Sequence, residues 1–268
     1  FDERCRAEAV PAPLAWGRLL DDVAGLAMPS GIPTVIHFAR FELSFLRDLH
    51  ERARPGEPFP LDAVCLHGIA RRLLPDLPRR NLRALAGFLG FSPELVRRSA
   101  GHVEATAFAW RALVDRLAPL GVRTWSDLGA FLDERAPPRS QKRGYPIEAT
   151  RRRALPDEPG VYRFVRSNGD VLYVGKAASL RKRVSSHFVA GRKATERALE
   201  MLSQAQDVEV TVTASTLEAA LLEADEIKRL DPPYNVHLRE TGRQAWFATR
   251  EGLSVADLSS EAARLGPF

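Results

Sequence analysis

Short apolar runs and helical apolar periods alternate along the chain between Ile32 and about Leu132. The run TVIHF predicts a strand, and ELSFLRDLHERA predicts an amphipathic helix, because its apolar residues recur at helical spacing. The same reasoning predicts a strand end running into a helix in LDAVCLHGIARRLL, and a short helix closed by Gly90 in NLRALAGFLG. This alternation indicates a helix-rich α/β or α+β unit.

A longer helix follows in HVEATAFAWRALVDRLAPLG, with Gly121 as its stop. One side of it carries the apolar residues Ala105, Ala109, Ala112, Leu113 and Leu117. The composition then changes, because DERAPPRSQKRGYPIEATRRR holds three prolines and many basic residues with almost no apolar period. We interpret this stretch as a linker. It is either a solvated tether or a basic strap that neutralises DNA phosphates.

A hairpin opens the second unit. The Asn-Gly pair inside VYRFVRSNGDVLYV predicts a two-residue turn with positive φ at both residues. That turn sets Phe164 opposite Tyr173, and Tyr162 opposite Gly175. Since side chains alternate along a strand, all four lie on one face, with the tyrosines as diagonal neighbours. Gly175 then leaves an open floor between the tyrosines, which suits a site that admits a phosphate or a water.

Basic residues follow this hairpin closely in the segment ASLRKRVSSHF. Ser179 predicts the N-cap of a helix on which Arg183 and His187 stand four apart and therefore share a face. Lys176 is expected in the turn before this helix. Three potential cations so close together suit an anionic ligand such as phosphate, although a basic solvated helix explains the same spacing.

A further helix is predicted in STLEAALLEADEIKRL, where Ser215 and Glu218 form a capping box. On a helical wheel Glu223 falls on the apolar side, among Ala219, Ala220, Ile227 and Leu230. A buried carboxylate without a partner is costly, so an ion, a hydrogen-bonding cluster or an active site is the expected reason for it. The prolines of DPPYN end the helix and bring Tyr234 and Asn235 close to its C-terminal end.

Composition narrows the class of protein. The 268 residues are enough for two domains, and 45% hydrophobic with 27% charged residues is typical of a soluble protein without a membrane span. A first residue Phe1 is expected of a fragment. Cys5 and Cys65 are too few for a disulfide framework, which fits a reducing cytoplasm, and the histidines lack zinc-ligand spacings. A net charge of +5 and a pI of about 9.5 permit nucleic-acid binding.

Three motifs, PGVY, YVGKA with SLRKRV, and EAALLEADEIKRLDPPYN, resemble the GIY-YIG nuclease domain of the UvrC and Cho type. The resemblance covers about residues 155–238, and the two Gly-Tyr halves of the predicted hairpin match the half-motifs that name the family. It implies a small α/β domain that hydrolyses a DNA phosphodiester with metal assistance. Glu223 would hold one divalent cation, Mg²⁺ or Mn²⁺, which can keep waters and phosphate oxygens as its other ligands.

The resemblance also implies roles for other residues. Tyr173, or a water that it orients, matches the general base, and Tyr162 matches a phenol near the attacking water. Arg183 and Lys176 match cations that stabilise charge at the scissile phosphate. Asn235 matches a residue that braces the site.

His187 stands where the UvrC branch commonly has Tyr, although other GIY-YIG branches place His there, and we expect a helper base. Tyr173 needs a neighbouring cation or the metal, because an unperturbed tyrosine is a poor base at neutral pH. The basic residues expected to contact DNA are Lys176, Arg181, Lys182, Arg183, Arg151, Arg152 and Arg153.

The first unit resembles the DEDD exonucleases, such as the epsilon subunit of DNA polymerase III, through HFARFELSFL and RRSAGHVEATAF. Glu42 stands where that family has Asp in its second motif. Arg97 and His102 stand where the third motif has His and Asp, and the first motif is missing. Two-metal chemistry needs several carboxylates. The resemblance therefore implies an RNase H-like fold with a degenerate exonuclease site, kept for DNA or partner binding.

The expected organisation is an exonuclease-like domain over residues 1–132, a linker over 133–154, a GIY-YIG domain over 155–250 and a tail over 251–268, where SVADLSSEAARL predicts a closing helix. The expected function is a single nick in bacterial nucleotide excision repair, made in the cytoplasm at the nucleoid with UvrB-like loading proteins. The alternatives are a non-catalytic DNA-binding accessory protein, a restriction or mobile-element nuclease, and a 3′–5′ exonuclease of the polymerase III epsilon type.

Overall fold

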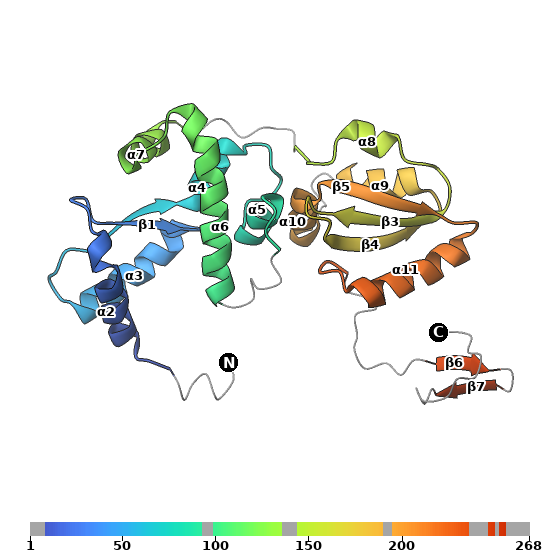
Figure 1. Ribbon diagram of the computed structural model, residues 1–268, viewed down its shortest axis with the longest axis horizontal. Helices are drawn as coiled ribbons and strands as arrows, with labels where there is room; N and C mark the ends of the chain where they lie inside the picture. The colour runs from blue at the N-terminus through green and yellow to red at the C-terminus, as the bar shows by residue number, and fades with distance from the viewer. Residues whose placement is uncertain are drawn as a thin grey trace.

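The chain folds into two units of helices and strands (Figure 1). The computed structural model describes residues 9–92, 99–135, 144–189, 195–235, 246–249 and 252–255. The mixed α and β class expected from the sequence is confirmed. No helix in these described ranges is long and apolar enough to cross a membrane.

The first unit is mostly helical. Its elements are α2 (Ala12–Val23), η1 (Ala24–Leu26), β1 (Ile32–Ile36), α3 (Ala39–Ala53), β2 (Leu61–Cys65), α4 (Leu66–Leu73), α5 (Leu82–Phe88), α6 (Ser99–Leu117), η3 (Ala118–Leu120) and α7 (Trp125–Asp133). Strands β1 and β2 pair in parallel, from Ile32 opposite Leu61 to Ile36 opposite Cys65. The parallel pair is possible because α3 carries the chain back between them.

The core of this unit forms around α6. The predicted apolar side of α6 is confirmed at Ala105, Ala109, Leu113 and Leu117, which are all buried, while Ala112 is only half-buried. These residues pack against apolar side chains of α4 and α5 such as Ile69 and Leu85. A second small cluster joins α2 to β1 through Trp16, Leu20 and Ile32.

The second unit is built on a three-stranded antiparallel sheet in the order β4-β3-β5. Its elements are α8 (Ala149–Arg153), β3 (Gly160–Val165), β4 (Val171–Ala177), α9 (Leu180–Val189), α10 (Glu196–Gln204), β5 (Asp207–Val212) and α11 (Thr216–Leu230). One face of the sheet packs on α11 through Val161, Val174, Ala219 and Ile227. The other face, with Tyr162 and Phe164, packs on α9 and α10, and Figure 1 shows α9 and α11 on opposite sides of the sheet.

The hairpin register is as predicted, with Phe164 opposite Tyr173 and Tyr162 opposite Gly175. The predicted two-residue turn is wrong, because only Gly169 has a positive φ, of 88°. The backbone N–H of Arg166 instead donates to the carbonyl of Asp170 at 2.9 Å, which closes a three-residue turn. A shift in register between Phe164 and Val165 then compensates for the longer turn, in the manner of a β-bulge.

Part of the stretch expected to be a linker packs on the second unit. Ile147 is 2% exposed within the core beside α9, and the Tyr145 ring lies 5.0 Å from the Phe188 ring. Helix α8 follows directly. Two apolar residues at a spacing of two make no visible period, which explains why the sequence predicted a tether. Residues 136–143 lie outside the described ranges.

The predicted closing helix is wrong at its start. Strand β7 (Gly252–Val255) includes the first two residues of SVADLSSEAARL and pairs antiparallel with β6 (Trp246–Thr249). The remaining residues of that segment lie outside the described ranges. A four-residue strand is too short to distinguish from a helix end by periodicity.

The two units contact each other along α5 and α10. The Asn81 amide donates to Glu200 Oε2 at 2.7 Å, and the Arg79 backbone N–H donates to Ser203 Oγ at 2.9 Å. Gly87 lies against Gln204, where an added Cβ would come within 2.0 Å of Oε1. The interface is therefore close-packed and polar.

Candidate active site

The two tyrosines meet on the α9 side of the hairpin. Their ring centroids are 6.0 Å apart, and the ring of Tyr162 lies over Gly175. A Cβ at position 175 would approach Tyr162 Oη to 2.6 Å and Tyr173 Cε1 to 2.8 Å. The predicted open floor is thus wrong, since the phenol of Tyr162 fills it. Glycine is needed here because the ring packs directly on the backbone.

Tyr162 is fully buried and its hydroxyl lies 2.8 Å from His187 Nε2. Burial raises the pKa of Tyr162 well above its ordinary value, and the neighbouring Tyr173 raises it further. Burial lowers the pKa of His187 to about 4, and Arg183 contributes in the same direction. Both groups are therefore neutral near pH 7, and their hydrogen bond holds the phenol in place. This arrangement favours an orienting role for His187 over the expected helper base.

Arg183 brings a permanent positive charge to the tyrosine pair. It stands on α9, whose first turn is capped by Ser179, with the Lys182 N–H donating to Ser179 Oγ at 3.4 Å. Interaction with the hydroxyl of Tyr162, and then with that of Tyr173, raises the pKa of Arg183. Arg183 thus places a fixed positive charge beside both phenols.

Glu223 reaches from α11 to the end of β4. Its Oε1 accepts from the Lys176 N–H at 3.0 Å, and its Oε2 lies 2.8 Å from Lys176 Nζ. The Glu223 side chain is 14% exposed, against 52% for that of Lys176. The prediction that Lys176 lies in a turn is wrong, because it is the penultimate residue of β4. The Glu223 carboxylate thus lies at the edge of the apolar face of α11, beside the long and half-exposed side chain of Lys176.

Asn235 holds the edge strand from outside. Its Oδ1 accepts from the Val174 N–H at 2.9 Å, and its Nδ2 donates to the Val174 carbonyl at 2.8 Å. Strand β4 is at the edge of the sheet, so these two backbone groups have no neighbouring strand within the described sheet. The side-chain amide of Asn235 therefore makes the two hydrogen bonds that a neighbouring strand would make, and it fixes the backbone of Val174 between Tyr173 and Gly175.

Sequence reasoning missed a buried ion pair between α11 and β3. Glu226 is 4% exposed, and Arg163 Nε donates to its Oε2 at 2.5 Å while Nη2 contacts Oε1. The helical wheel selected Glu223, yet Glu226 is the more deeply buried carboxylate. The available signal was Arg163 itself, a charged residue in the middle of an apolar strand.

The other basic residues have different surroundings. Arg181 pairs with Asp157, and Arg151 Nε lies 2.9 Å from Asp207 Oδ1. Arg152 lies 4.1 Å from the centre of the Phe188 ring. Lys182 and Arg153 are exposed. Contact of all five residues with DNA remains a prediction, and Arg151 and Arg152 also hold α8 on the second unit.

The degenerate exonuclease positions do not come together with an ion-binding group. Glu42 is exposed in the first turn of α3, and His102 is exposed on α6. Arg97 lies outside the described residues. Among the residues that the structure describes, no group of three His, Cys, Asp or Glu side chains could hold a metal ion. Cys65 is a free thiol, while Cys5 lies outside the described ranges.

Comparison with known proteins assigns the second unit. The family described as the UvrC-like GIY-YIG domain matches residues 158–236. These residues therefore form a GIY-YIG domain, a class of nuclease domain. Within this class the domain is of the UvrC type, as the sequence motifs indicated.

Individual relatives cover different parts of the chain. A Mycobacterium tuberculosis (strain CDC 1551 / Oshkosh) protein with the provisional name bifunctional exonuclease/endonuclease protein MT2247 is 32% identical over 240 residues, which is 87% of this chain and 36% of that protein. UvrABC system protein C of Alkalilimnicola ehrlichii is 47% identical over 116 residues, covering 43% of this chain and 19% of that protein. The first match includes residues of both units.

A solved structure is also similar to the second unit. It is the GIY-YIG N-terminal endonuclease domain of UvrC from Thermotoga maritima, bound to its catalytic divalent cation, magnesium. The identity is 36%, over 32% of this chain and 93% of that domain, with a TM-score of 0.30. The chain thus spans about a third of the mycobacterial relative and a fifth of the full-length UvrC protein.

Proposed function

We propose that this protein is a metal-dependent endonuclease that makes a single nick in DNA through the GIY-YIG domain. The observation that supports it most is the placement of Glu223 and Lys176 at the end of the strand that carries Tyr173. Strand β4 thus provides a candidate base, Tyr173, and a cation that can contact phosphate, Lys176. Helix α11 provides Glu223, a carboxylate that can hold a metal ion. We also propose the expected division into an exonuclease-like domain, a linker, a GIY-YIG domain and a tail, with the linker ending before Tyr145, because Tyr145 and Ile147 pack on the second unit.

The residues fit a single divalent cation. Glu223 offers two carboxylate oxygens at the solvent rim, and the present partner of Oε2 is an ammonium group, so this oxygen already faces positive charge. Mg²⁺ and Mn²⁺ accept one protein carboxylate together with waters and phosphate oxygens. When bound, such an ion would supply positive charge to the scissile phosphate and acidify a bound water.

The remaining groups divide the work of hydrolysis. Tyr173, half-buried beside Arg183, would take the proton of the attacking water, while Tyr162 stays protonated and holds that water by a hydrogen bond. Lys176 and Arg183 would stabilise the negative charge that develops on the phosphate. His187 and Asn235 would keep Tyr162 and the backbone of β4 in position.

The biological setting follows from the UvrC-type domain. We propose a role in nucleotide excision repair, in the bacterial cytoplasm at the nucleoid, with a UvrB-like protein that presents damaged DNA. One candidate nuclease site in the described chain supports one nick, and structure-selective cutting is proposed in place of sequence reading. The first unit would serve as an inactive platform, since Glu42 is the one carboxylate at the expected exonuclease positions and the described residues contain no group of three possible metal ligands.

Nicking of supercoiled plasmid tests this proposal. Purified full chain, with Mg²⁺ or Mn²⁺, should convert plasmid to the nicked form, and Glu223→Gln and Tyr173→Phe should each lower the rate by about 10²-fold or more. Asp225→Asn is the matched control, because Asp225 is an exposed carboxylate on the same helix. Faster nicking of ultraviolet-irradiated plasmid would support the repair role.

The contrary outcome is also specific. The wild type and the variants could all bind DNA yet fail to nick it, even with excision-repair loading proteins present. That result would contradict the nuclease proposal and favour a DNA-binding accessory protein. Stepwise trimming of end-labelled single strands that survives Glu223→Gln would instead assign exonuclease activity to the first unit.

A further inference from the structure

The segment that carries Tyr234 and Asn235 lies along the edge strand of the candidate active site. The Tyr234 backbone N–H donates to the Leu172 carbonyl at 3.1 Å, and the Asn235 side chain makes both of its hydrogen bonds to Val174. Leu172 and Val174 are the two neighbours of Tyr173 in β4. The backbone of the candidate base is therefore held on both sides by two consecutive residues that follow α11.

Tyr234 is itself anchored by α10. Its Oη donates to Glu200 Oε1 at 2.6 Å and accepts from Gln204 Nε2 at 2.5 Å, and the residue is buried. Burial raises the pKa of Tyr234 well above its ordinary value, and the bond to Glu200 raises it further. The hydroxyl therefore keeps its proton near neutral pH and remains the donor to Glu200. The position of Tyr234 thus depends on two side chains of α10.

The first unit contacts both of these α10 side chains. The Asn81 amide donates to Glu200 Oε2 at 2.7 Å, so the Glu200 carboxylate bonds Asn81 with one oxygen and Tyr234 with the other. The Glu200 side chain is 16% exposed. Gly87 lies against Gln204, close enough that an added Cβ would meet its Oε1 at 2.0 Å. A contiguous network therefore runs from the first unit to the residue that holds β4.

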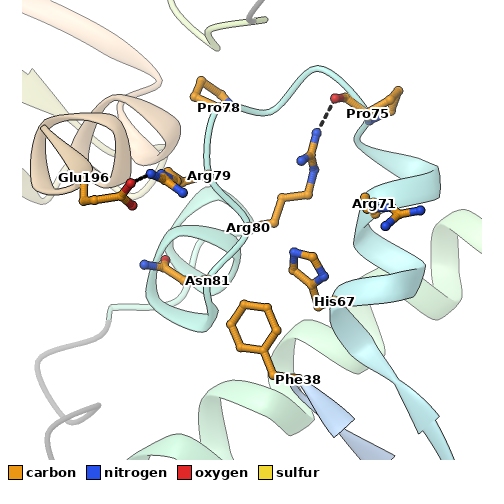
Figure 2. A pocket seen from close by; sticks show the side chains of 9 residues that line it. All are labelled: Phe38, His67, Arg71, Pro75, Pro78, Arg79, Arg80, Asn81 and Glu196. Carbon is orange, nitrogen blue, oxygen red and sulfur yellow. Dashed lines mark hydrogen bonds and ion pairs between the residues drawn. The ribbon is translucent and has the colours of Figure 1, made fainter. Parts of the chain in front are cut away.

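The Asn81 contact lies at the edge of a pocket of about 640 Å³, whose walls include Asn81 and Phe38 of the first unit and Glu196 of α10. Figure 2 shows Asn81 and the ion pair of Arg79 with Glu196 on the same side of this pocket. The Glu196 side chain is 78% exposed. This ion pair thus joins the same two units outside the buried network, and it offers a matched comparison for Asn81.

We propose that Asn81, Glu200 and Tyr234 are positioning residues of the nuclease site, through which the first unit sets the geometry of Tyr173. The effect on nicking rests on the proposed function, whereas the effect on β4 does not. An edge strand relies on the segment that pairs with it, so a displaced Tyr234 would shift the backbone beside Tyr173. The first unit would thereby contribute to the reaction without an exonuclease site of its own.

Asn81→Asp separates this role from the folding of the first unit. Asn81 Oδ1 also caps α5 by accepting from the Ala84 N–H at 2.9 Å, and aspartate is an equally good N-cap. The variant removes the donor to Glu200 and sets two carboxylates against each other. In the plasmid assay with the full chain, kcat should fall about tenfold with an unchanged KM for DNA, because a displacement of about 1 Å costs about 10²-fold.

An exchange of the two groups tests the network by rescue. The double variant Asn81→Asp with Glu200→Gln restores an amide-to-carboxylate bond with the partners reversed, and the glutamine carbonyl can still accept from Tyr234. Its kcat should return to within about twofold of the wild type. Tyr234→Phe, which removes the anchoring hydroxyl and keeps the ring, should lower kcat as Asn81→Asp does. Glu196→Gln is the matched control on the same helix and should leave kcat unchanged.

Hydrogen exchange followed by mass spectrometry reads out the strand without requiring activity. Asn81→Asp and Tyr234→Phe should speed exchange in the peptide over Val171–Ala177 about tenfold, since the loss of one hydrogen bond to a charged group has an effect of that order. The peptide over Thr216–Leu230 serves as the internal reference and should be unchanged.

Four results would overturn the inference: wild-type exchange over Val171–Ala177 in Asn81→Asp, a rise in KM alone, equal losses in Asn81→Asp and Glu196→Gln, or no rescue in the double variant. A wild type that does not nick plasmid would contradict the proposed function instead. In that case hydrogen exchange in the single and double variants would still decide whether the first unit holds β4.

Discussion

At the residue scale, the site depends on Gly175, because glycine has no side chain to displace the Tyr162 ring. Gly175 lets the phenol of Tyr162 lie on β4, within reach of His187 Nε2 at 2.8 Å and beside Tyr173. The close approach of the ring explains why position 175 does not carry one of the β-branched residues that strands ordinarily favour. A Cβ atom at position 175 would lie too close to the rings of Tyr162 and Tyr173 for both to keep their positions.

Gly175→Ala is therefore expected to displace Tyr162 or bend β4. Because both neighbours of the new Cβ belong to packed rings, we expect a loss of about 1–3 kcal/mol in the free energy of unfolding, as for other overpacked cores. Nicking should fall by about 10²-fold, since small displacements of positioned groups cost that much. Denaturant unfolding and the plasmid assay measure the two effects.

The control for this substitution is Gly17→Ala, because nothing lies within 4 Å of a Cβ at position 17 in α2. Alanine there should leave stability equal or higher by up to about 1 kcal/mol. Full nicking activity in Gly175→Ala would show that the position of Tyr162 is not needed for the reaction.

At the element scale, α11 is fixed to the sheet by the pair Arg163 and Glu226, with side chains only 13% and 5% exposed. The partner charges satisfy each other within an otherwise apolar interface. Glu223 stands one turn earlier on α11, so the pair also determines how far the candidate metal ligand reaches toward Lys176.

Breaking this pair should be costly. Glu226→Ala is expected to lower the free energy of unfolding by about 3–5 kcal/mol, because it leaves Arg163 buried and uncompensated. The double variant Arg163→Met with Glu226→Leu should regain much of this loss, since an apolar pair of similar volume is often tolerated. Thermal or denaturant unfolding of the single and double variants gives the comparison.

The neighbouring exposed residue provides the control, and Asp225→Ala should change stability by about 0.5 kcal/mol or less. Equal destabilisation by Asp225→Ala and Glu226→Ala would contradict the assignment of the pair as the contact that fixes α11.

At the scale of the whole molecule, a polar network joins the first unit to the braced strand. Glu200 on α10 accepts from the Asn81 amide at 2.7 Å and from Tyr234 Oη at 2.6 Å. Tyr234 precedes Asn235, which clamps Val174. Gln204 donates to Tyr234 Oη at 2.5 Å and lies against Gly87. The two units are thus packed through side chains that also support the edge strand.

Gly87→Ala should weaken the contact between the units. Its Cβ would meet Gln204, which is fully buried and bonded to Tyr234 and Arg166, so the amide cannot move aside without losing these bonds. We expect a larger radius of gyration by small-angle X-ray scattering and two separated unfolding transitions by calorimetry. Gly129→Ala in α7 is the control, because nothing lies within 4 Å of a Cβ at that position.

An unchanged radius and a single transition in Gly87→Ala would show that α5 and α10 do not hold the units together. In that case the polar network would be a local feature of α10, without a part in joining the units.

The sequence by itself determined those features that depend on neighbours along the chain. Helix faces, the N-caps at Ser179 and Ser215, the pairing of Tyr162 with Gly175 and the GIY-YIG motifs could all be predicted, because local hydrogen bonds and side-chain periods determine them. The turn was an exception, since two loop lengths with a compensating bulge give the same register.

Only the tertiary structure decided which groups meet across the fold. The burial of Glu226 by Arg163, the filling of the space above Gly175, the contact of α5 with α10 and the pocket at Phe38 each join segments distant in sequence. No single periodicity encodes such contacts, because they depend on how packed elements exclude water and leave each polar group with a partner. The sequence determined the elements, and packing decided the surroundings of each charge and ring.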